Sequence, residues 1–258
     1  MSIDRVDSLN DEASGLSFNG KRYVATNKKY SEVVVIVPFY GAKRNNLLRH
    51  INWLNDIGYD VVAFDLKFKP KSIKDSIITA DFEFGFKHVW ADQIGIILNE
   101  VFGPKIIFAF SNPSSAAIEA IAERHAIDVK AMVCDSGPSG ELWNSIHKYY
   151  KHEIPIRIPI LRELATTLAT TVTSLNFLSE VHSDLEKFPE GFEILSIRGW
   201  KDPLISPNQI DKIFNHPQHL NVQRLSLPRA KHLDGLKNHF EEYSAAVTDY
   251  LARHSTKI

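Results

Sequence analysis

The chain has 258 residues, of which 44% are hydrophobic, so it is long enough to bury the core of one α/β domain. Its 30 Lys and Arg residues nearly balance its 31 Asp and Glu residues, so bulk charge gives no reason to expect nucleic acid or an anionic membrane as a partner. No run reaches the ~18 apolar residues of a membrane span, and the polar first residues lack the pattern of a secretory signal. We therefore predict a cytoplasmic protein with no membrane span, no nucleic-acid partner and a small or neutral substrate.

Metal and disulfide chemistry have little support in the sequence. Cys134 is the only cysteine, so an internal disulfide is impossible, and the zinc-site spacings that are built from cysteine pairs are absent. The simplest interpretation of Cys134 is a small buried residue at the end of a strand. We expect neither a metal nor a cofactor.

The first predicted elements are a hairpin, a buried strand and a helix. The segment 15–27 (GLSFNGKRYVATN) has Asn-Gly between two strand-like runs, the strongest hairpin signal in a single sequence. The segment 31–40 (SEVVVIVPFY) has a near-continuous β-branched run, as expected for a strand that is buried on both faces. The segment 44–58 then repeats apolar residues at helical spacing and stops at Gly58.

Strands and helices alternate through the rest of the chain. Strands are predicted in 59–66, 129–138, 192–199 and 222–228, and helices in 84–103 and 234–254. The segment 105–120 contains a strand followed by a helix. This alternation predicts an α/β fold with about eight strands, mostly parallel, and helices on both faces of the sheet.

The connection between Cys134 and Phe192 interrupts this alternation. It is nearly sixty residues long, far beyond the usual few residues of α/β connections, so it should contain structure of its own. The segment 158–178 (IPILRELATTLATTVTSLNFL) is apolar enough to form helices that lie over the sheet edge. We interpret the insertion, at about 138–190, as a helical cap over a substrate pocket, with ordinary helical packing as the alternative. Nothing else divides the chain, so a single domain over 1–258 is predicted.

The segment 105–120 (KIIFAFSNPSSAAIEA) runs from an apolar strand directly into an alanine-rich helix. A sharp turn between a strand and a helix can expose a serine hydroxyl above a sheet and direct helix N–H groups beside it. The usual pattern is G-x-S-x-G, because the strand and helix backbones approach closely at the turn. Ser111 fits this position best. Ala109 is a small residue two positions before it, and Pro113 suits the first turn of a helix, where its missing N–H would have no partner.

Ser114 is the alternative nucleophile at this junction. Ala116 gives it a small residue two positions later, but Pro113 would then stand immediately before the nucleophile and the strand would be longer. A third possibility is that no serine here is catalytic, because serine is common at helix N-caps for structural reasons. We prefer Ser111, and the backbone N–H of Asn112 would then be one donor of the oxyanion hole.

A serine hydroxyl needs a base to take its proton and an acid to orient that base. Asp202 lies in the loop after one predicted strand, and His232 lies in the loop after the next. The carboxyl ends of neighbouring parallel strands gather ligand chemistry at one edge of a sheet. This order of elements and loops predicts that Asp202 and His232 complete a catalytic triad with Ser111. Asp135, which follows an earlier strand, is a reserve acid, although its surroundings also suit an ordinary turn.

The second oxyanion donor is expected in the loop after the strand of 31–40, where such a donor normally lies. In that loop we take the N–H of Tyr40 as the first choice and the N–H of Phe39 as the second. The alternative is that Gly41 simply makes a turn there. Both choices place a backbone donor at the same sheet edge as Ser111.

One basic segment, 66–75 (LKFKPKSIKD), has two interpretations. Its four lysines could form a docking patch for an acidic carrier protein or for a phosphate-bearing thioester. A solvated loop explains them as well, and we favour that interpretation. The lysines are Lys67, Lys69, Lys71 and Lys74.

In its elements and loops, the chain resembles the α/β-hydrolase superfamily over almost its whole length, from the hairpin to the last helix. Within that superfamily it is most similar to the acyl-transferase/thioesterase family of bacterial luminescence operons, whose nucleophile also has alanine and serine around it instead of glycine. The resemblance implies that Ser111 is the nucleophile, with Asp202 as the acid and His232 as the base. It also implies that Phe39 and Tyr40 occupy the oxyanion-loop position.

The residues and the resemblance together predict an α/β-hydrolase fold, with a mostly parallel eight-stranded sheet and a helical cap insertion. The expected activity is that of a serine hydrolase or acyltransferase, which cleaves an ester or thioester through an acyl-enzyme. A fatty acyl thioester is one candidate substrate, and an acyl carrier protein is one candidate partner. Phe110 and Pro113 depart from the family's elbow. The alternative is therefore a non-catalytic binding protein that keeps the fold and the pocket.

Overall fold

A computed structural model of the chain describes residues 16–67 and 85–258. Within these residues, one sheet of seven strands has the spatial order β1-β3-β2-β4-β5-β6-β7. Only β1 is antiparallel to its neighbour, and the other strands are parallel. The strands are β1 (Lys21–Tyr23), β2 (Val33–Val37), β3 (Asp60–Ala63), β4 (Lys105–Phe110), β5 (Val129–Asp135), β6 (Glu193–Gly199) and β7 (Asn221–Leu227).

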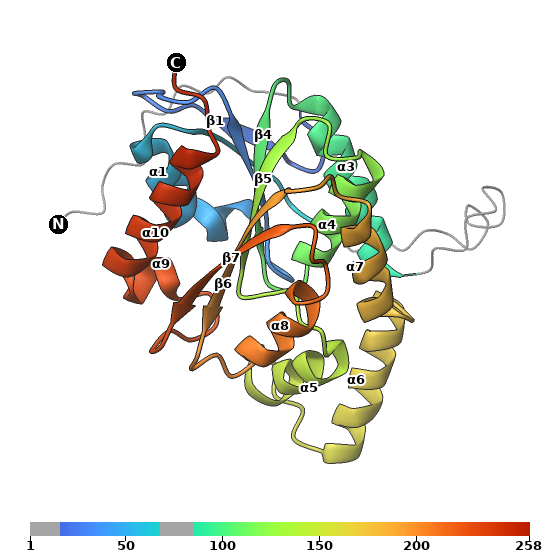
Figure 1. Cartoon of the computed structure of the whole chain (residues 1–258). Helices are drawn as coiled ribbons and strands as arrows, with labels where there is room; N and C mark the ends of the chain where they lie inside the picture. Colours follow the sequence, from blue (N-terminus) through green and yellow to red (C-terminus); the bar gives the residue numbers. More distant parts are fainter. Residues whose placement is uncertain (1–15, 68–84) are drawn as a thin grey trace.

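Helices cover both faces of the sheet (Figure 1). On one face lie α1 (Leu48–Ile57), α9 (Gly235–Asn238) and α10 (Phe240–Arg253); the short 3-10 helix η1 (Arg44–Leu47) precedes α1. On the other face lie α3 (Phe86–Glu100), α4 (Ser114–Glu123), α7 (Phe177–Glu186) and α8 (Pro207–Phe214). The α/β-hydrolase arrangement of a mostly parallel sheet between two helical layers is thus present.

The burial of β2 explains its unbroken apolar sequence. Val33, Val35 and Val37 pack with α3 and α4 on one face of the sheet. Val34 and Ile36 pack with α1 and α10 on the other face. Because side chains alternate across a strand, a central strand that is covered on both faces needs an apolar residue at every position.

The predicted hairpin is wrong in its first strand, which reduces the sheet from the expected eight strands to seven in the described residues. Leu16 and Gly20 form only an isolated bridge. Phe18 and Asn19 both have positive φ, at 56° and 53°, so the turn lies one residue earlier than the Asn-Gly pair suggests. The chain then continues into β1, which pairs with β3.

Two helix ends show how local sequence decides a boundary. Gly58 ends α1 as predicted: it has φ 108°, and its N–H bonds to the carbonyls at the end of the helix. The last helix, predicted as one piece over 234–254, is instead divided into α9 and α10. His239 lies between them with φ −133°, which is outside the helical region.

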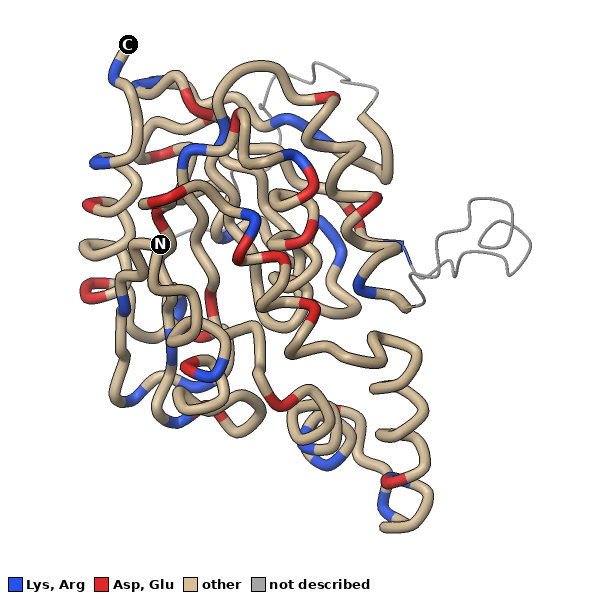
Figure 2. The backbone as a smooth tube through the Cα atoms, turned by 45° about the vertical axis from the view of Figure 1, so that its right-hand side comes forward, with Lys and Arg blue, Asp and Glu red and all other residues tan. Residues whose placement is uncertain are grey.

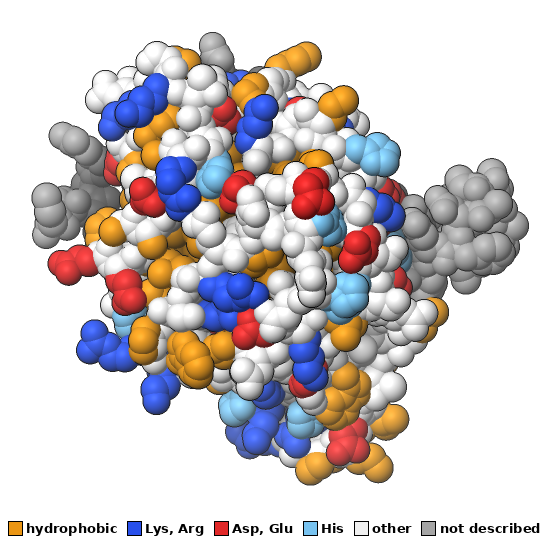
Figure 3. Space-filling model, viewed as in Figure 1, with side chains coloured by type: hydrophobic (Ala, Val, Ile, Leu, Met, Phe, Trp, Pro, Cys, Tyr) orange, Lys and Arg blue, Asp and Glu red, His pale blue; other side chains and the backbone are white. Residues whose placement is uncertain are grey.

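The long connection of 138–190 contains α5 (Leu142–His152) and α6 (Pro159–Thr173) before α7. In Figure 1, α5 and α6 lie together beyond one end of the sheet, whereas α7 lies against α4. Figure 3 shows hydrophobic side chains at the lower end of the surface, where α6 lies in Figure 1. The large apolar residues of α6 that are exposed are Ile160, Leu161, Leu164 and Leu168. The predicted helices are therefore present in this connection.

The distribution of charge agrees with the near-zero net charge of the sequence. Figure 2 shows basic and acidic residues interspersed over the backbone, with neither sign confined to one side. None of the helices in 16–67 and 85–258 has the length and apolar character that crossing a membrane requires.

Candidate active site

Ser111 occupies a sharp turn between β4 and α4. Its φ is 55°, in the left-handed region that residues with a side chain rarely adopt. Its N–H donates to the carbonyl of Asp135 over 2.8 Å, and its own carbonyl accepts the N–H of Ser114 over 3.1 Å. The surrounding backbone therefore holds the strained conformation and presents the Ser111 side chain at the carboxyl edge of the sheet.

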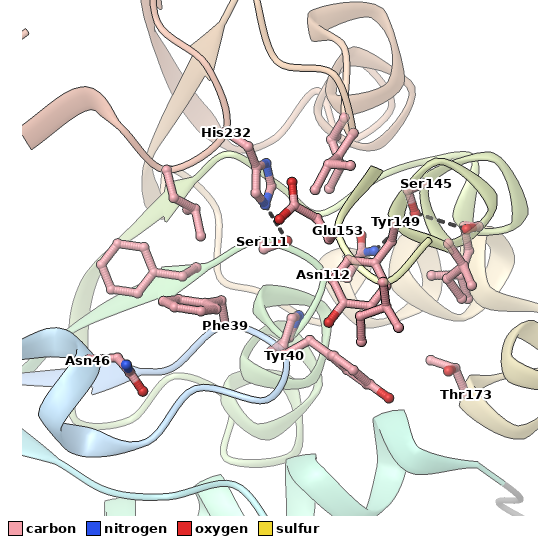
Figure 4. A pocket seen from close by; sticks show the side chains of 18 of the residues that line it. Phe39, Tyr40, Asn46, Ser111, Asn112, Ser145, Tyr149, Glu153, Thr173 and His232 are labelled. Atoms are coloured by element: carbon pink, nitrogen blue, oxygen red, sulfur yellow. Dashed lines mark hydrogen bonds between the residues drawn. The ribbon is translucent and has the colours of Figure 1, made fainter. Parts of the chain in front are cut away.

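A chain of hydrogen bonds links the three residues of the predicted triad. His232 Nε2 lies 3.1 Å from Ser111 Oγ, which Figure 4 shows as a dashed line. His232 Nδ1 lies 2.6 Å from Asp202 Oδ2. Because a carboxylate accepts the proton of Nδ1, Nε2 is left with the lone pair that can accept the hydroxyl proton of Ser111.

Asp202 is fixed by its own loop. Its side chain is fully buried, and Oδ1 accepts the backbone N–H groups of Leu204 and Ile205 over 2.7 and 2.9 Å. Oδ2 remains directed at the imidazole. This arrangement follows from a carboxylate placed two and three residues before free N–H groups, which is a common local turn pattern.

The loops that carry Asp202 and His232 approach each other closely at Gly199. A Cβ at Gly199 would lie 2.5 Å from the carbonyl oxygen of Ala230, far inside contact distance. The N–H of Lys201 donates to that same carbonyl over 2.9 Å. A glycine at the end of β6 is therefore required to bring the acid and the histidine together.

The reserve acid Asp135 lies behind the histidine loop. Its two carboxyl oxygens accept the hydroxyls of Tyr243 and Ser136, over 2.7 and 2.8 Å. Burial raises the pKa of Asp135 above its usual range, and these two hydrogen bonds only partly oppose that rise. Ser136 Oγ also accepts the N–H of Leu233 over 3.2 Å. Asp135 thus supports the residue that follows His232, whereas Asp202 bonds to the imidazole itself.

Both residues chosen as oxyanion donors border the same space as Ser111. The N–H of Asn112 makes no hydrogen bond to any described residue, while its side chain is held by Ser145 Oγ and by the N–H of Ser139, each over 3.0 Å. Tyr40 follows β2 and lines the cavity beside Ser111. Gly41 does make a turn, with φ 73°, and this turn directs the preceding loop toward Ser111.

Ser114, the alternative nucleophile, is placed differently. It is fully buried as the first residue of α4, and its hydroxyl donates to the carbonyl of Ser111. Pro113 precedes the helix with a φ of −58°, and its carbonyl accepts the N–H of Ala117. The proline therefore fits the start of α4 without loss of a hydrogen bond.

Gly137, in the loop after β5, contributes to the site although its sequence pattern did not predict it. A Cβ at this position would lie 2.4 Å from the carbonyl oxygen of Ser111. The close backbone approach at this elbow is thus relieved by a glycine on the neighbouring loop, while Ala109 and Pro113 occupy the usual glycine positions. The only signal was Ser-Gly-Pro after a strand, a pattern that an ordinary turn explains equally well.

Ser111 and His232 open into a cavity of about 620 Å³. Its lining is mostly apolar, and aromatic rings pack into one wall, where Tyr40 makes edge contacts with Trp90 at 6.1 Å and with Tyr149 at 5.7 Å between ring centres. Phe86 stacks on Trp90. Such an apolar cavity with a few converging polar groups is the usual form of a small-molecule site.

No protein-family model matches the chain, and no curated protein matches its sequence. Solved structures do match it. An esterase from Pyrococcus furiosus superimposes with a TM-score of 0.64 at 17% identity, over 93% of this chain and 92% of that one. An alpha/beta hydrolase domain-containing protein from mouse has a TM-score of 0.60 at 13% identity, over 91% and 93%. The chain has the α/β-hydrolase fold. A carboxyl esterase from Bacillus coagulans gives a similar result, with a TM-score of 0.63 at 15% identity over 91% and 93%.

Within the α/β-hydrolase fold, Ser111, Asp202 and His232 all follow strands at the same sheet edge. In 16–67 and 85–258, no group of three or more His, Cys, Asp or Glu side chains is arranged to hold a metal ion. The basic segment predicted as a docking patch or a solvated loop falls mainly outside the described residues, except for Lys67. Cys134 is buried, as predicted.

Proposed function

We propose that this protein is a serine hydrolase that cleaves an ester or thioester through an acyl-enzyme. The observation that supports it most is the continuous hydrogen-bonded chain from Ser111 through His232 to Asp202, which opens into an apolar cavity. The strained backbone of Ser111 adds to this support, because strain of this kind is concentrated at functional sites.

In the proposed mechanism, Ser111 Oγ attacks the carbonyl carbon of the substrate while His232 Nε2 takes the hydroxyl proton. Asp202 keeps the imidazole oriented and stabilises its positive form. The backbone N–H groups of Asn112 and Tyr40 would bind the oxyanion that develops in the transition state. His232 then donates its proton to the leaving group, and the acyl group stays on Ser111. Water or another acceptor, activated by the same histidine, releases it.

The acyl group is the part of the substrate that the aromatic and apolar wall would bind. The helices α5 and α6 contribute Ile146, Ala169 and Val172 to the cavity lining, and we propose that the insertion of 138–190 acts as a cap within a single domain. The similarity to the acyl-transferase/thioesterase family of luminescence operons favours a thioester, with an acyl carrier protein as a candidate donor. The esterase names of the structural neighbours favour a simple ester.

A fluorophosphonate probe tests the nucleophile directly, because it reacts with a serine that a histidine activates. We expect covalent labelling of the parent protein and of Ser114→Ala, and none of Ser111→Ala. Loss of labelling in Ser114→Ala alone would move the site by one helical turn. An unlabelled parent protein would instead support the non-catalytic binding protein.

A panel of p-nitrophenyl esters and acyl thioesters of increasing chain length tests the substrate. A preference for thioesters over esters of equal length would support the thioesterase branch of the proposal. A transfer of the acyl group to an added alcohol, in competition with water, would support the acyltransferase branch.

A further inference from the structure

The cavity extends to both sides of Ser111. In Figure 4, Asn46 and Thr173 lie on opposite sides of the Ser111–His232 pair. One end is formed by α3, α5 and α6, and it carries the aromatic wall. The other end is formed by η1 with α1 and by α9, and its lining includes Asn46, Arg49 and Lys237.

The two cations at the second end are exposed, and they have no ion-pair partner within 16–67 and 85–258. Neither Arg49 nor Lys237 makes an ion pair or a side-chain hydrogen bond with another described residue. By contrast, Arg198 pairs with Asp211, and Lys105 pairs with Asp128. A positive charge that lines a cavity without a protein counter-charge is a binding group for an anion.

The rest of the lining leaves this end positive. Burial, with a contribution from the charge of Arg49, lowers the pKa of His50 to about 3, so His50 is neutral at physiological pH. Glu153, which follows the last residue of α5, is the only carboxylate among the described residues that line the cavity. The two cations lie on α1 and α9, whereas Glu153 follows α5 and is drawn near Ser111 and His232 in Figure 4.

The position of His232 relates this positive end to the reaction. In the proposed mechanism the histidine returns its proton to the leaving group, so the leaving group must lie next to Nε2. Lys237 belongs to α9, which follows the His232 loop in the chain. The helix α1 lies on the same face of the sheet as α9: Ile51 and Leu54 belong to the same core cluster as Leu236. Both cations thus belong to helices on the same face of the sheet, and one of these helices follows directly from the His232 loop.

We propose that Arg49 and Lys237 form a subsite for a carboxylate or phosphate group carried by the leaving group of a small ester or thioester. The proposal rests on the proposed hydrolase function and narrows its substrate class. A cavity of about 620 Å³ limits the whole substrate to a small molecule. Arg49 supplies a planar donor fork and Lys237 a point charge, a combination that suits an oxyanion.

The test pairs a charge on the enzyme with a charge on the substrate. 4-Butanoyloxybenzoate and 4-butanoyloxyphenyl phosphate carry an anion on the leaving group, and 4-butanoyloxybenzamide is their neutral counterpart. For each protein, kcat/KM on an anionic ester is divided by kcat/KM on the amide, so that general effects on folding or on the triad cancel. We expect this ratio to fall about threefold to tenfold in Arg49→Gln and in Lys237→Gln, as for one solvent-accessible charge pair.

Lys130→Gln is the matched control. It removes an exposed charge near the start of β5, at the amino-terminal end of the strand, whereas Ser111 lies beyond the carboxyl ends of the strands. Its ratio should equal that of the parent protein. The carboxylate and phosphate esters show which oxyanion is preferred. An unchanged ratio in both test variants, or an equal fall in Lys130→Gln, would overturn the subsite. So would an anion preference that appears only with p-nitrophenyl monosuccinate, where the carboxylate belongs to the acyl group.

A measurement without turnover separates this proposal from the hydrolase function. In Ser111→Ala protein, NMR titration compares the Kd of 4-hydroxybenzoate with that of 4-hydroxybenzamide. A preference for the anion that is lost when Arg49→Gln is added supports the subsite even if no ester is cleaved. Equal Kd values for the two ligands would overturn it even if esters are cleaved rapidly.

Discussion

Two of the buried polar clusters in the described residues differ in one respect: the first borders the cavity of about 620 Å³ and the second does not. The serine cluster consists of Ser111, His232 and Asp202. The lysine cluster consists of Lys87 and the residues around it on α3, α4 and α7: His88, Glu119, Glu180 and Asp184. In the lysine cluster, Nζ of Lys87 contacts Glu119 and lies 2.9 Å from Asp184 Oδ2, and His88 Nδ1 lies 2.7 Å from Glu119 Oε1.

The clusters differ in what their last member faces. Lys87 and Glu119 both form ion pairs with other protein groups, and both side chains are almost inaccessible to solvent. Burial lowers the pKa of Lys87, but the charges of Glu119 and Asp184 outweigh it and raise that pKa above its usual value. The hydroxyl of Ser111 instead ends its chain at the cavity. Burial of charge therefore marks a well-paired helix junction as readily as a reactive site, and access to a cavity separates the two.

The largest effect is expected for Asp202→Asn. The amide would still accept the N–H groups of Leu204 and Ile205, but it would donate to His232 Nδ1 and force the proton onto Nε2. The imidazole could then no longer accept the Ser111 proton, so the rate of ester cleavage should fall about 10⁴-fold. Steady-state kinetics and a thermal melt check this. A fall below tenfold with an unchanged melt would contradict the assigned role of Asp202.

Lys87→Met should affect stability in place of chemistry. It removes the buried cation that Glu119 and Asp184 share and leaves them only His88 and the half-exposed Lys187, which should lower the free energy of unfolding by about 3–5 kcal/mol. Chemical denaturation measures the change. Lys187→Met is the control, since it removes a half-exposed partner of Asp184 and should cost under about 1 kcal/mol. If the Lys87→Met protein is still folded but Ser111 is no longer labelled, the purely structural role of the lysine cluster is wrong.

Tyr243→Phe should weaken the support behind the histidine loop. It removes one donor from Asp135, whose partner Ser136 accepts the N–H of Leu233. We expect the fluorophosphonate labelling rate to fall about tenfold and the stability to fall by about 1–3 kcal/mol. Tyr250→Phe is the control, because its buried hydroxyl bonds to the Met132 carbonyl over 3.2 Å, away from that loop. Equal labelling rates in the two variants would show that the network has only a structural role.

The smallest effect is expected for the pH dependence of the stability that the lysine cluster contributes. Burial lowers the pKa of His88, but the hydrogen bond and charge of Glu119 outweigh it, so that pKa is raised above its ordinary value. The folded state then holds the proton more tightly than the unfolded state, so the stabilisation is complete below about pH 6.5 and is lost as pH rises through the folded pKa. The difference in unfolding free energy between the parent protein and His88→Gln should therefore shrink from pH 5.5 to 8.5. A difference that grows with pH would contradict the assigned pairing.

The sheet and the order of its loops could be predicted because they depend on local patterns. The β-branched run of β2 and the alternation of strand and helix predicted the fold, and the loops after β6 and β7 contain Asp202 and His232, the predicted acid and base. Local patterns also placed Ser111 at the elbow. The roles of these three residues stay predictions until the labelling experiment is done.

The remaining features depend on partners that are distant in sequence. The hydroxyl of Tyr243 donates a hydrogen bond to Asp135, more than a hundred residues away in sequence. No rule of residue spacing predicts such a hydrogen bond. Lys87 resembled an ordinary polar position of an amphipathic helix until α4 and α7 supplied its carboxylates. The hairpin failed for a different reason, because the turn shifted by one residue and left the first strand as a single bridge.

Gly137 has a consequence for how such proteins can change over time. Because the backbone of Ser111 occupies the space that a side chain at Gly137 would need, the two loops must vary together. Ala109 and Pro113 stand where the usual elbow has glycines, and the glycine that relieves the close contact stands in the loop after β5 instead. A search for the G-x-S-x-G signature would therefore pass over a chain whose elbow is built in this way.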